Sequence, residues 1–291
     1  MEQILITEEN IESYYDHMDA EAAEYIFRKY GRGLAMHADA DPAPQAVIVW
    51  KYVHMNDREQ PGVRILWMVA EDQTAAVELL EAFEREVTAF GAADVQYECT
   101  GEKEAVLEAL QAAGYEIRTK ESPEVIRRVG DFEALIGTGN RTLSQEIKSI
   151  DQLMFRKFHA GVRACMAQGK MGALEDFDTL PFDWFEPKVS CCIQSSGNVC
   201  GFLLVHRSAC DRLVVKLLGA WRPATNRELL GMIKYAIVQA VERYSPDTQV
   251  VIRPYNEATE AIVRQMFPKD ERRLVQQIEK RIIQGGKCNV N

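Results

Sequence analysis

The two halves of the sequence contain the same pattern, an apolar run followed by an amphipathic helix. The apolar run covers residues 65–69 in the first half and residues 213–218 in the second, and each run is long enough for a buried strand. Helix positions superpose with a constant offset of 150 residues, in the pairs Leu79 and Leu229, Leu80 and Leu230, Phe83 and Ile233, and Val87 and Ile237. An internal repeat of this length predicts two similar structural units in one chain.

Further elements extend the repeat on both sides. A short strand and a second helix follow in each half, at residues 94–100 and 102–113 and again at residues 249–253 and 257–266. A helical segment and then a hairpin precede it, the helical segments at residues 11–30 and 143–168 and the hairpins at residues 33–55 and 189–207. This order predicts an α/β fold with a mixed sheet and packed helices (α+β) in each half.

The chain is long enough for two domains that each bury a core. It has 291 residues, and the GTGN segment interrupts all periodicity near residues 130–140. We therefore expect domains at residues 1–130 and 131–291. The end of the chain allows two interpretations, because Leu274, Ile278 and Ile282 suit a helix face whereas the segment also stands where a final strand belongs.

Charge and cysteine content exclude several classes of function. Lys and Arg number 34 against 44 Asp and Glu, a net charge of -10, so nucleic-acid binding is not expected. No apolar run approaches membrane-spanning length and the first ten residues are acidic, which predicts a cytoplasmic protein without a membrane partner. The seven cysteines and five histidines show no zinc or HExxH spacing, so we expect reduced thiols and no metal.

Two segments and the order of elements resemble the GNAT superfamily of acyl-CoA-dependent N-acyltransferases. The segments are LQAAGYE at residues 110–116 and VVIRPYNEATEAIVRQMF at residues 250–267. The resemblance covers nearly the whole chain as a tandem pair, each domain with a mixed, mostly antiparallel sheet. It implies acetyl-CoA or another acyl-CoA as co-substrate, an amine on a small molecule or peptide as acceptor, and a monomer or homodimer.

Neither half contains the glycine loop with which the family binds the CoA pyrophosphate. The first half has Glu71 and Asp72 at this place, two carboxylates that repel phosphates and complement the helix dipole as a cap. The second half has arginines and small residues, so any CoA site is expected there. The residues that the resemblance assigns to CoA are Leu217, Leu218 and Gly219 through their backbone, then Arg222, Thr225, Asn226, Arg227 and Asn256. The alternative is that the arginines are solvated and that Thr225 or Asn226 caps the helix.

Catalytic residues are less clearly marked. The family's acidic Tyr is replaced by Leu110 in the first half and by Ile262 in the second, and neither transfers a proton. Asn256, Tyr255 and Glu186 are the candidates that remain, with Asp183 and His206 as further possible bases. Asn256 matches the family's helix-start Asn but is equally explained as a cap. The aromatic residues Phe177, Phe182, Trp184 and Phe185 form either core or an acceptor pocket.

These residues favour catalysis by proximity and backbone donors in the second half, with a degenerate first half. An open cleft bordered by Arg222, Arg253 and Asn256 is expected for an enzyme. Trp221 or Tyr255 packed into that cleft would indicate a protein without activity. Two alternatives remain open at this point, a non-catalytic binding or scaffold protein and a transferase that uses aminoacyl-tRNA, against which the net charge of -10 counts.

Overall fold

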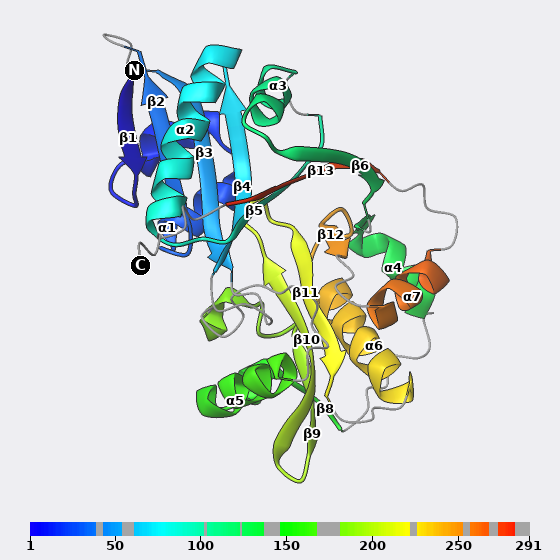
Figure 1. Cartoon of the computed structure of the whole chain (residues 1–291). Helices are drawn as coiled ribbons and strands as arrows, with labels where there is room; N and C mark the ends of the chain where they lie inside the picture. Colours follow the sequence, from blue (N-terminus) through cyan, green and yellow to red (C-terminus); the bar gives the residue numbers. More distant parts are fainter. Residues whose placement is uncertain are drawn as a thin grey trace. The chain divides into compact units, whose positions relative to one another are not determined.

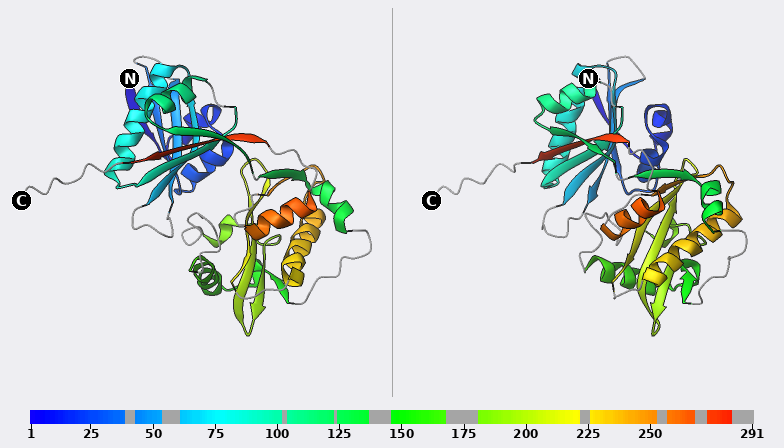
Figure 2. Two further views of the ribbon diagram at one scale, coloured as in Figure 1. Left: turned by 45° about the vertical axis from the view of Figure 1, so that its right-hand side comes forward. Right: turned by 90° about the vertical axis from the view of Figure 1, so that its right-hand side faces the viewer.

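The computed structural model divides the chain into two compact units, one made of Met1–Ser122 with Arg273–Asn291 and one of Pro123–Arg272. Each unit is a mixed sheet flanked by helices, as Figure 1 and Figure 2 show, and this confirms the predicted fold class. The structure describes residues 1–38, 43–53, 61–101, 104–122, 124–136, 146–167, 181–221, 226–252, 257–267 and 273–282.

The first unit contains a seven-stranded sheet in the order β1-β2-β3-β4-β5-β13-β6. The pair β4 and β5 is parallel and every other pair in this sheet is antiparallel. The strands are β1 (Glu2–Ile6), β2 (Arg32–His37), β3 (Pro44–Val53), β4 (Gly62–Ala70), β5 (Asp94–Cys99), β6 (Glu116–Glu121) and β13 (Leu274–Arg281), and the helices are η1 (Ile11–His17), α1 (Ala20–Phe27), α2 (Gln73–Ala89) and α3 (Glu104–Ala112).

The second unit contains a six-stranded sheet in the order β7-β12-β11-β10-β9-β8. Here β11 and β12 form the parallel pair and the other pairs are antiparallel. The strands are β7 (Val125–Arg128), β8 (Ile147–Ser149), β9 (Cys191–Ser195), β10 (Asn198–Arg207), β11 (Leu213–Ala220) and β12 (Gln249–Ile252), and the helices are α4 (Val129–Ile136), η2 (Ile150–Gln152), α5 (Phe155–Met166), η3 (Phe182–Trp184), α6 (Asn226–Arg243) and α7 (Glu257–Met266).

Each sheet is completed by a strand from the other half of the chain. The last strand, β13, lies between β5 and β6 in the first sheet, and β7 pairs with β12 in the second. The structure therefore differs from the expected domains at residues 1–130 and 131–291, because the chain leaves the first unit after Ser122 and returns at Arg273. It also resolves the two interpretations of the C-terminal segment in favour of a strand.

The repeat is real in the strands, but its offset changes in the helices. Both β4 and β11 carry one extra residue opposite their hairpin partner, Leu66 and Lys216, which are 150 residues apart. The helices α2 and α6 instead begin 153 residues apart. Leu230 is 56% exposed, so it is no counterpart of the buried Leu80. The predicted offset of 150 is thus wrong for the helices; buried positions agree at 153, in the pairs Leu79 and Met232, Ala82 and Tyr235, Phe83 and Ala236, and Val87 and Ala240.

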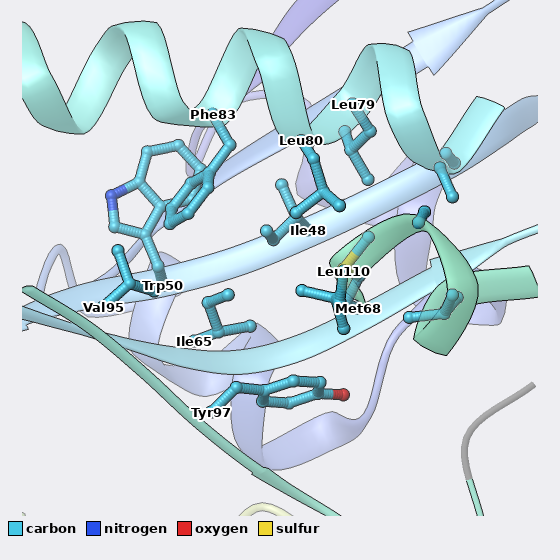
Figure 3. Packing of buried hydrophobic residues seen from close by; sticks show 14 of the residues in the cluster. Ile48, Trp50, Ile65, Met68, Leu79, Leu80, Phe83, Val95, Tyr97 and Leu110 are labelled. Atoms are coloured by element: carbon cyan, nitrogen blue, oxygen red, sulfur yellow. The ribbon is translucent and has the colours of Figure 1, made fainter. Parts of the chain in front are cut away.

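Aromatic packing fills the core of the first unit between its sheet and α2. The indole of Trp50 on β3 meets the ring of Phe83 on α2 edge to face, with ring centroids 5.2 Å apart, as Figure 3 shows. Both side chains are fully buried. A pair of rings in this arrangement stabilises the fold by about 0.5–1.5 kcal/mol in addition to the stabilisation from their buried apolar area.

Local sequence sets the ends of α2. Asp72 precedes the helix, and its carboxylate accepts a hydrogen bond from the Ala75 N–H at 2.9 Å. The predicted acidic cap is therefore confirmed for Asp72. Gly91 follows the helix with a positive φ of 87°, a conformation that glycine adopts without strain. Among the described residues, no helix combines the length and the apolar character needed to cross a membrane.

Candidate functional site

The parallel strands of the second unit separate partway along β11. Pairing with β12 covers only Leu213 to Val215, which face Val250 to Ile252. The separation coincides with a bulge, because Leu204 faces Leu217 whereas Val205 faces Val215, which leaves Lys216 as the extra residue. A bulge increases local twist and ends regular pairing, so it accounts for the departure of β11 from β12.

Beyond the bulge, β11 does not pair with β12 in the part of the chain that the structure describes. On the other side, the Trp221 N–H donates to the Cys200 O of β10 at 3.1 Å. Because alternate residues of a strand direct their backbone groups to the same neighbour, Gly219 and Leu217 also face β10. Leu218 and Ala220 therefore direct their N–H and C=O groups to the side where β12 has departed.

Lys216 was not anticipated from the sequence. Its side chain is only 4% exposed at the bulge, and no described residue forms a hydrogen bond or ion pair with its ammonium group. An ammonium group at the point where two strands separate can donate to a carbonyl oxygen or carboxylate. The signal in the sequence is a lysine within the apolar run at residues 213–218, a run whose apolar character alone predicts only a strand.

Three residues of the predicted CoA site, Arg222, Thr225 and Asn256, lie outside the described residues, as do Arg253 of the expected cleft and the catalytic candidate Tyr255. Asn226 is the first residue of α6, and Arg227 is exposed in the first turn of the same helix. The positive end of the helix dipole and the guanidinium of Arg227 thus coincide, and both favour an anion.

The backbone of Glu186 lies against Val205 of β10, the residue that faces Val215 beside the bulge. Its N–H donates to the Val205 O at 2.7 Å, and its carboxylate forms a hydrogen bond with the Tyr244 hydroxyl. Burial and then this hydrogen bond raise the pKa of Tyr244 above its ordinary value. The guanidinium of Arg207 lies 5.6 Å from the centroid of the Tyr244 ring. Glu186 therefore belongs to a polar contact with the end of α6.

The aromatic connection before β9 forms core on the α5 face of the second sheet. His206 is buried, its Nδ1 lies 2.6 Å from the Trp184 O, and its ring stacks on the Trp184 indole at 4.5 Å between centroids. Phe158 of α5 packs against Phe182, Phe185 and Phe202. Of the two interpretations of this cluster, core fits Trp184 and Phe185, each 1% exposed. Phe177 lies outside the described residues, and Asp183 is exposed.

Trp221 follows β11 and packs on the same aromatic layer. Its ring lies 5.6 Å from that of Phe202, between centroids. By the alternation of the strand, Trp221 and Gly219 present their side-chain positions to one face, and Phe202 faces Gly219 across the β10 and β11 pair. The indole of Trp221 is therefore held by Phe202 on the α5 face.

Thiols and metal ligands do not form a cluster in the part of the chain that the structure describes. No group of three or more His, Cys, Asp or Glu side chains there is placed to hold a metal ion. Cys191, Cys192 and Cys200 are buried and free. Burial raises the pKa of Cys192 to about 11, which keeps this thiol neutral and weakly nucleophilic near pH 7.

The first unit has the same strand separation but different surroundings. Its parallel pairing ends at Ile65 and Tyr97, one residue before the bulge at Leu66. Met68, the counterpart of Leu218 at the offset of 150, is buried in one cluster with Tyr97 and Leu110, which Figure 3 shows beside it. The N-terminus of α2 is occupied by the carboxylate of Asp72. The two units thus differ at the start of the long helix, where the first has the capping carboxylate of Asp72 and the second has Arg227 beside Glu228.

Solved structures with the same fold cover almost the whole chain. A tandem GNAT protein of clavulanic acid biosynthesis matches with a TM-score of 0.62 at 9% identity, over 96% of this chain and 98% of the other. A GCN5-related N-acetyltransferase of Sphaerobacter thermophilus matches with a TM-score of 0.57 at 11% identity, over 96% and 95%. One of Kribbella flavida matches with a TM-score of 0.52 at 13% identity, over 96% and 72%.

No protein-family model and no curated protein sequence matches the chain. At identities this low, the structural matches establish the fold, which a sequence can keep after its activity has changed. The repeated bulge and strand separation found in each unit agree with the matched tandem architecture. The chain therefore has a tandem GNAT fold, two GNAT-like domains in one polypeptide.

Proposed function

We propose that this chain is an acyl-CoA-dependent N-acyltransferase whose second unit binds the acyl-CoA and transfers its acyl group to an amine. The observation that carries the proposal is the separation of β11 from β12 beside the bulge at Lys216, because their described pairing ends at Val215 and Ile252. The matched structures described as GCN5-related N-acetyltransferases support the class of reaction.

The second unit fits an acyl-CoA in part. The edge of β11 beyond the bulge, where its pairing with β12 has ended, suits an extended pantetheine arm, which lies along it as a strand would. Arg227 and the start of α6 supply positive potential for phosphates. The fit is incomplete because the glycine loop of the family is absent, so the phosphates depend on side chains in place of backbone amides.

In the reaction that follows, the amine nitrogen bonds to the thioester carbonyl carbon, the carbon–sulfur bond breaks, and CoA leaves as a thiol with the proton that the amine loses. A backbone N–H of β11 stabilises the negative charge that develops on the carbonyl oxygen. The ammonium group of Lys216 is the nearest side-chain donor to that stretch along the strand, and we assign it to the carbonyl oxygen or to a carboxylate of the acceptor.

The test is calorimetric titration of the full chain with acetyl-CoA, comparing wild type with the double variant Arg222→Ala and Arg227→Ala. Each lost charged hydrogen bond weakens binding by about 1.5–3 kcal/mol, or roughly tenfold or more. The matched control is Arg243→Ala, because Arg243 is exposed at the opposite end of the same helix. Unchanged affinity in the double variant would place the phosphates elsewhere.

A second assay separates an enzyme from a binding protein. Release of free thiol from acetyl-CoA is measured across a panel of small amines and peptides. Binding of acetyl-CoA without release across a broad panel would support a non-catalytic binding protein, a role with which the absence of the family's acidic Tyr, at Leu110 and Ile262, agrees. If the chain neither binds acetyl-CoA nor releases thiol from it, two alternatives remain. They are a scaffold protein and a transferase that takes its acyl group from aminoacyl-tRNA.

A further inference from the structure

The second unit contains a cavity of about 90 Å³ between its sheet and the helices α6 and α7. Its walls are aliphatic and aromatic side chains throughout, among them Val205, Leu218, Ala236, Ile252 and Met266. A single water requires roughly 10–15 Å³ measured in this way, so the cavity has room for about six to nine groups of water or methylene size. Apolar walls offer water no hydrogen bonds, which makes the cavity suited to an apolar ligand.

The first unit fills the corresponding space with aromatic rings. Residues of the two sheets are equivalent when they hold the same place in the strand register; Trp50 and Val205, for example, each face the residue before the bulge. Residues of the helices α2 and α6 are equivalent at the offset of 153. In each pair a large ring in the first unit corresponds to a smaller residue that lines the cavity; the pairs are Trp50 and Val205, Phe83 and Ala236, and Tyr97 and Ile252. Figure 3 shows these three rings in the first unit. The cavity thus exists because the second unit lacks these rings.

The cavity is lined by residues that stand at the strand separation. Leu218 lines it with its side chain and directs its backbone to the side where β12 has departed. Ile252, the last residue of β12 to pair with β11, also lines it. A group attached to a thioester held beside Leu218 therefore has apolar space within reach in the interior of the same unit.

We infer that this cavity binds the acyl chain of the donor, so that the preferred co-substrate carries a saturated chain of about four to eight carbons, longer than acetyl. The inference rests on the proposed function and specifies its substrate class. An apolar cavity of this kind costs stability, because side chains around it lose contacts that packing would supply. An acyl chain supplies those contacts, whereas an acetyl group fills only the first part of the space.

The experiment measures the affinity of the full chain for CoA and for acetyl-, butyryl-, hexanoyl- and octanoyl-CoA by calorimetry. Each buried methylene should tighten binding by up to about fourfold until the cavity is full. The variant Ala236→Phe restores the ring found at Phe83 in the first unit. In this variant the affinity for CoA thioesters should no longer depend on the length of the acyl chain, and the affinity for CoA itself should stay unchanged. The milder variant Ala240→Val should reduce the dependence without abolishing it, and it serves where the larger side chain prevents folding.

The control variant is Leu230→Phe, which adds a ring on the same helix at a side chain that is 56% exposed. It should keep the wild-type dependence on chain length. If wild type binds CoA and acetyl-CoA but gains nothing from longer chains, the acyl pocket is refuted and the proposed function stands. If no CoA thioester binds, the proposed function fails and this inference fails with it.

Discussion

Single residues decide how tightly each core is packed. Phe83 is fully buried against Trp50, so Phe83→Ala removes a ring from the core and leaves a cavity. We expect the free energy of unfolding of the first unit to fall by about 3–5 kcal/mol, measured by urea denaturation. The matched control is Phe27→Ala, since Phe27 is 61% exposed and should cost less than about 1 kcal/mol. Equal losses in the two variants would contradict the packing described here.

Under the proposed function, Lys216 is a residue at which stability and activity oppose each other. Its side chain is only 4% exposed and forms no ion pair with any described residue, so the partial removal of its charge from water lowers stability. Lys216→Met keeps the length of the side chain and removes the charge. We expect a higher midpoint of thermal unfolding together with a lower kcat/KM for acyl transfer. The control is Lys148→Met, an exposed lysine on β8. A lower midpoint would show that the ammonium group is satisfied in the folded state.

At the scale of elements, an ion pair joins η2 to the connection before β9. Burial would raise the pKa of the Asp151 carboxyl, but hydrogen bonds from Lys188 and Ser149 outweigh it and hold this pKa below its ordinary value. A lowered pKa in the folded state means that the pair contributes stability above the unfolded pKa, and that this contribution is lost as the pH falls through the folded pKa. Lys188 is half exposed, so the contribution is modest.

We expect the free energy of unfolding to differ between wild type and the variant Lys188→Met, and the size of this difference to depend on pH. Near pH 6 the variant should be less stable by up to about 1 kcal/mol, and the difference should shrink toward zero below the folded pKa of Asp151. Urea denaturation at a series of pH values measures it. If the difference in the free energy of unfolding stays constant at acidic pH, the lost stability comes from packing of the aliphatic part of the lysine side chain and the ion pair does not contribute.

The sequence predicts elements better than it predicts their partners. The bulge-bearing strands and long helices were evident because apolar periodicity is local. The helix offset was misassigned by three residues, since a shift of three keeps a residue on the same side of a 3.6-residue turn and the apolar pattern still matches. Only burial, as in the exposed Leu230, separates the two offsets. The acidic cap at Asp72 was correct because a cap depends on residues three positions apart.

Strand exchange is the feature that periodicity could not reveal. The partners of β13 are β5 and β6, which lie more than 150 residues earlier in the chain. Leu274, Ile278 and Ile282 keep a helical spacing although the segment is a strand, because hydrogen bonds to two neighbours override local preference. The candidate site is limited in the same way, since Lys216 acquires meaning only from the bulge that β10 imposes on β11.

At the scale of the whole molecule, the exchange makes the first unit depend on the last strand of the chain. Removing residues 273–291 takes β13 from between β5 and β6, where it forms hydrogen bonds on both sides, and deprives the first core of the fully buried Ile278. Exposed edges and a lost core residue should unfold the first unit while the second sheet keeps all its strands. Hydrogen exchange should then show lost protection in β4 and β5 and retained protection in β10 and β11.

Two controls test whether the loss comes from β13 itself. A chain shortened only by residues 283–291 retains β13 and should match wild type. The separate peptide of residues 273–282, added to the chain that lacks residues 273–291, should restore protection to the first unit. Full protection of β5 after the larger deletion would show that the first sheet closes without the exchanged strand.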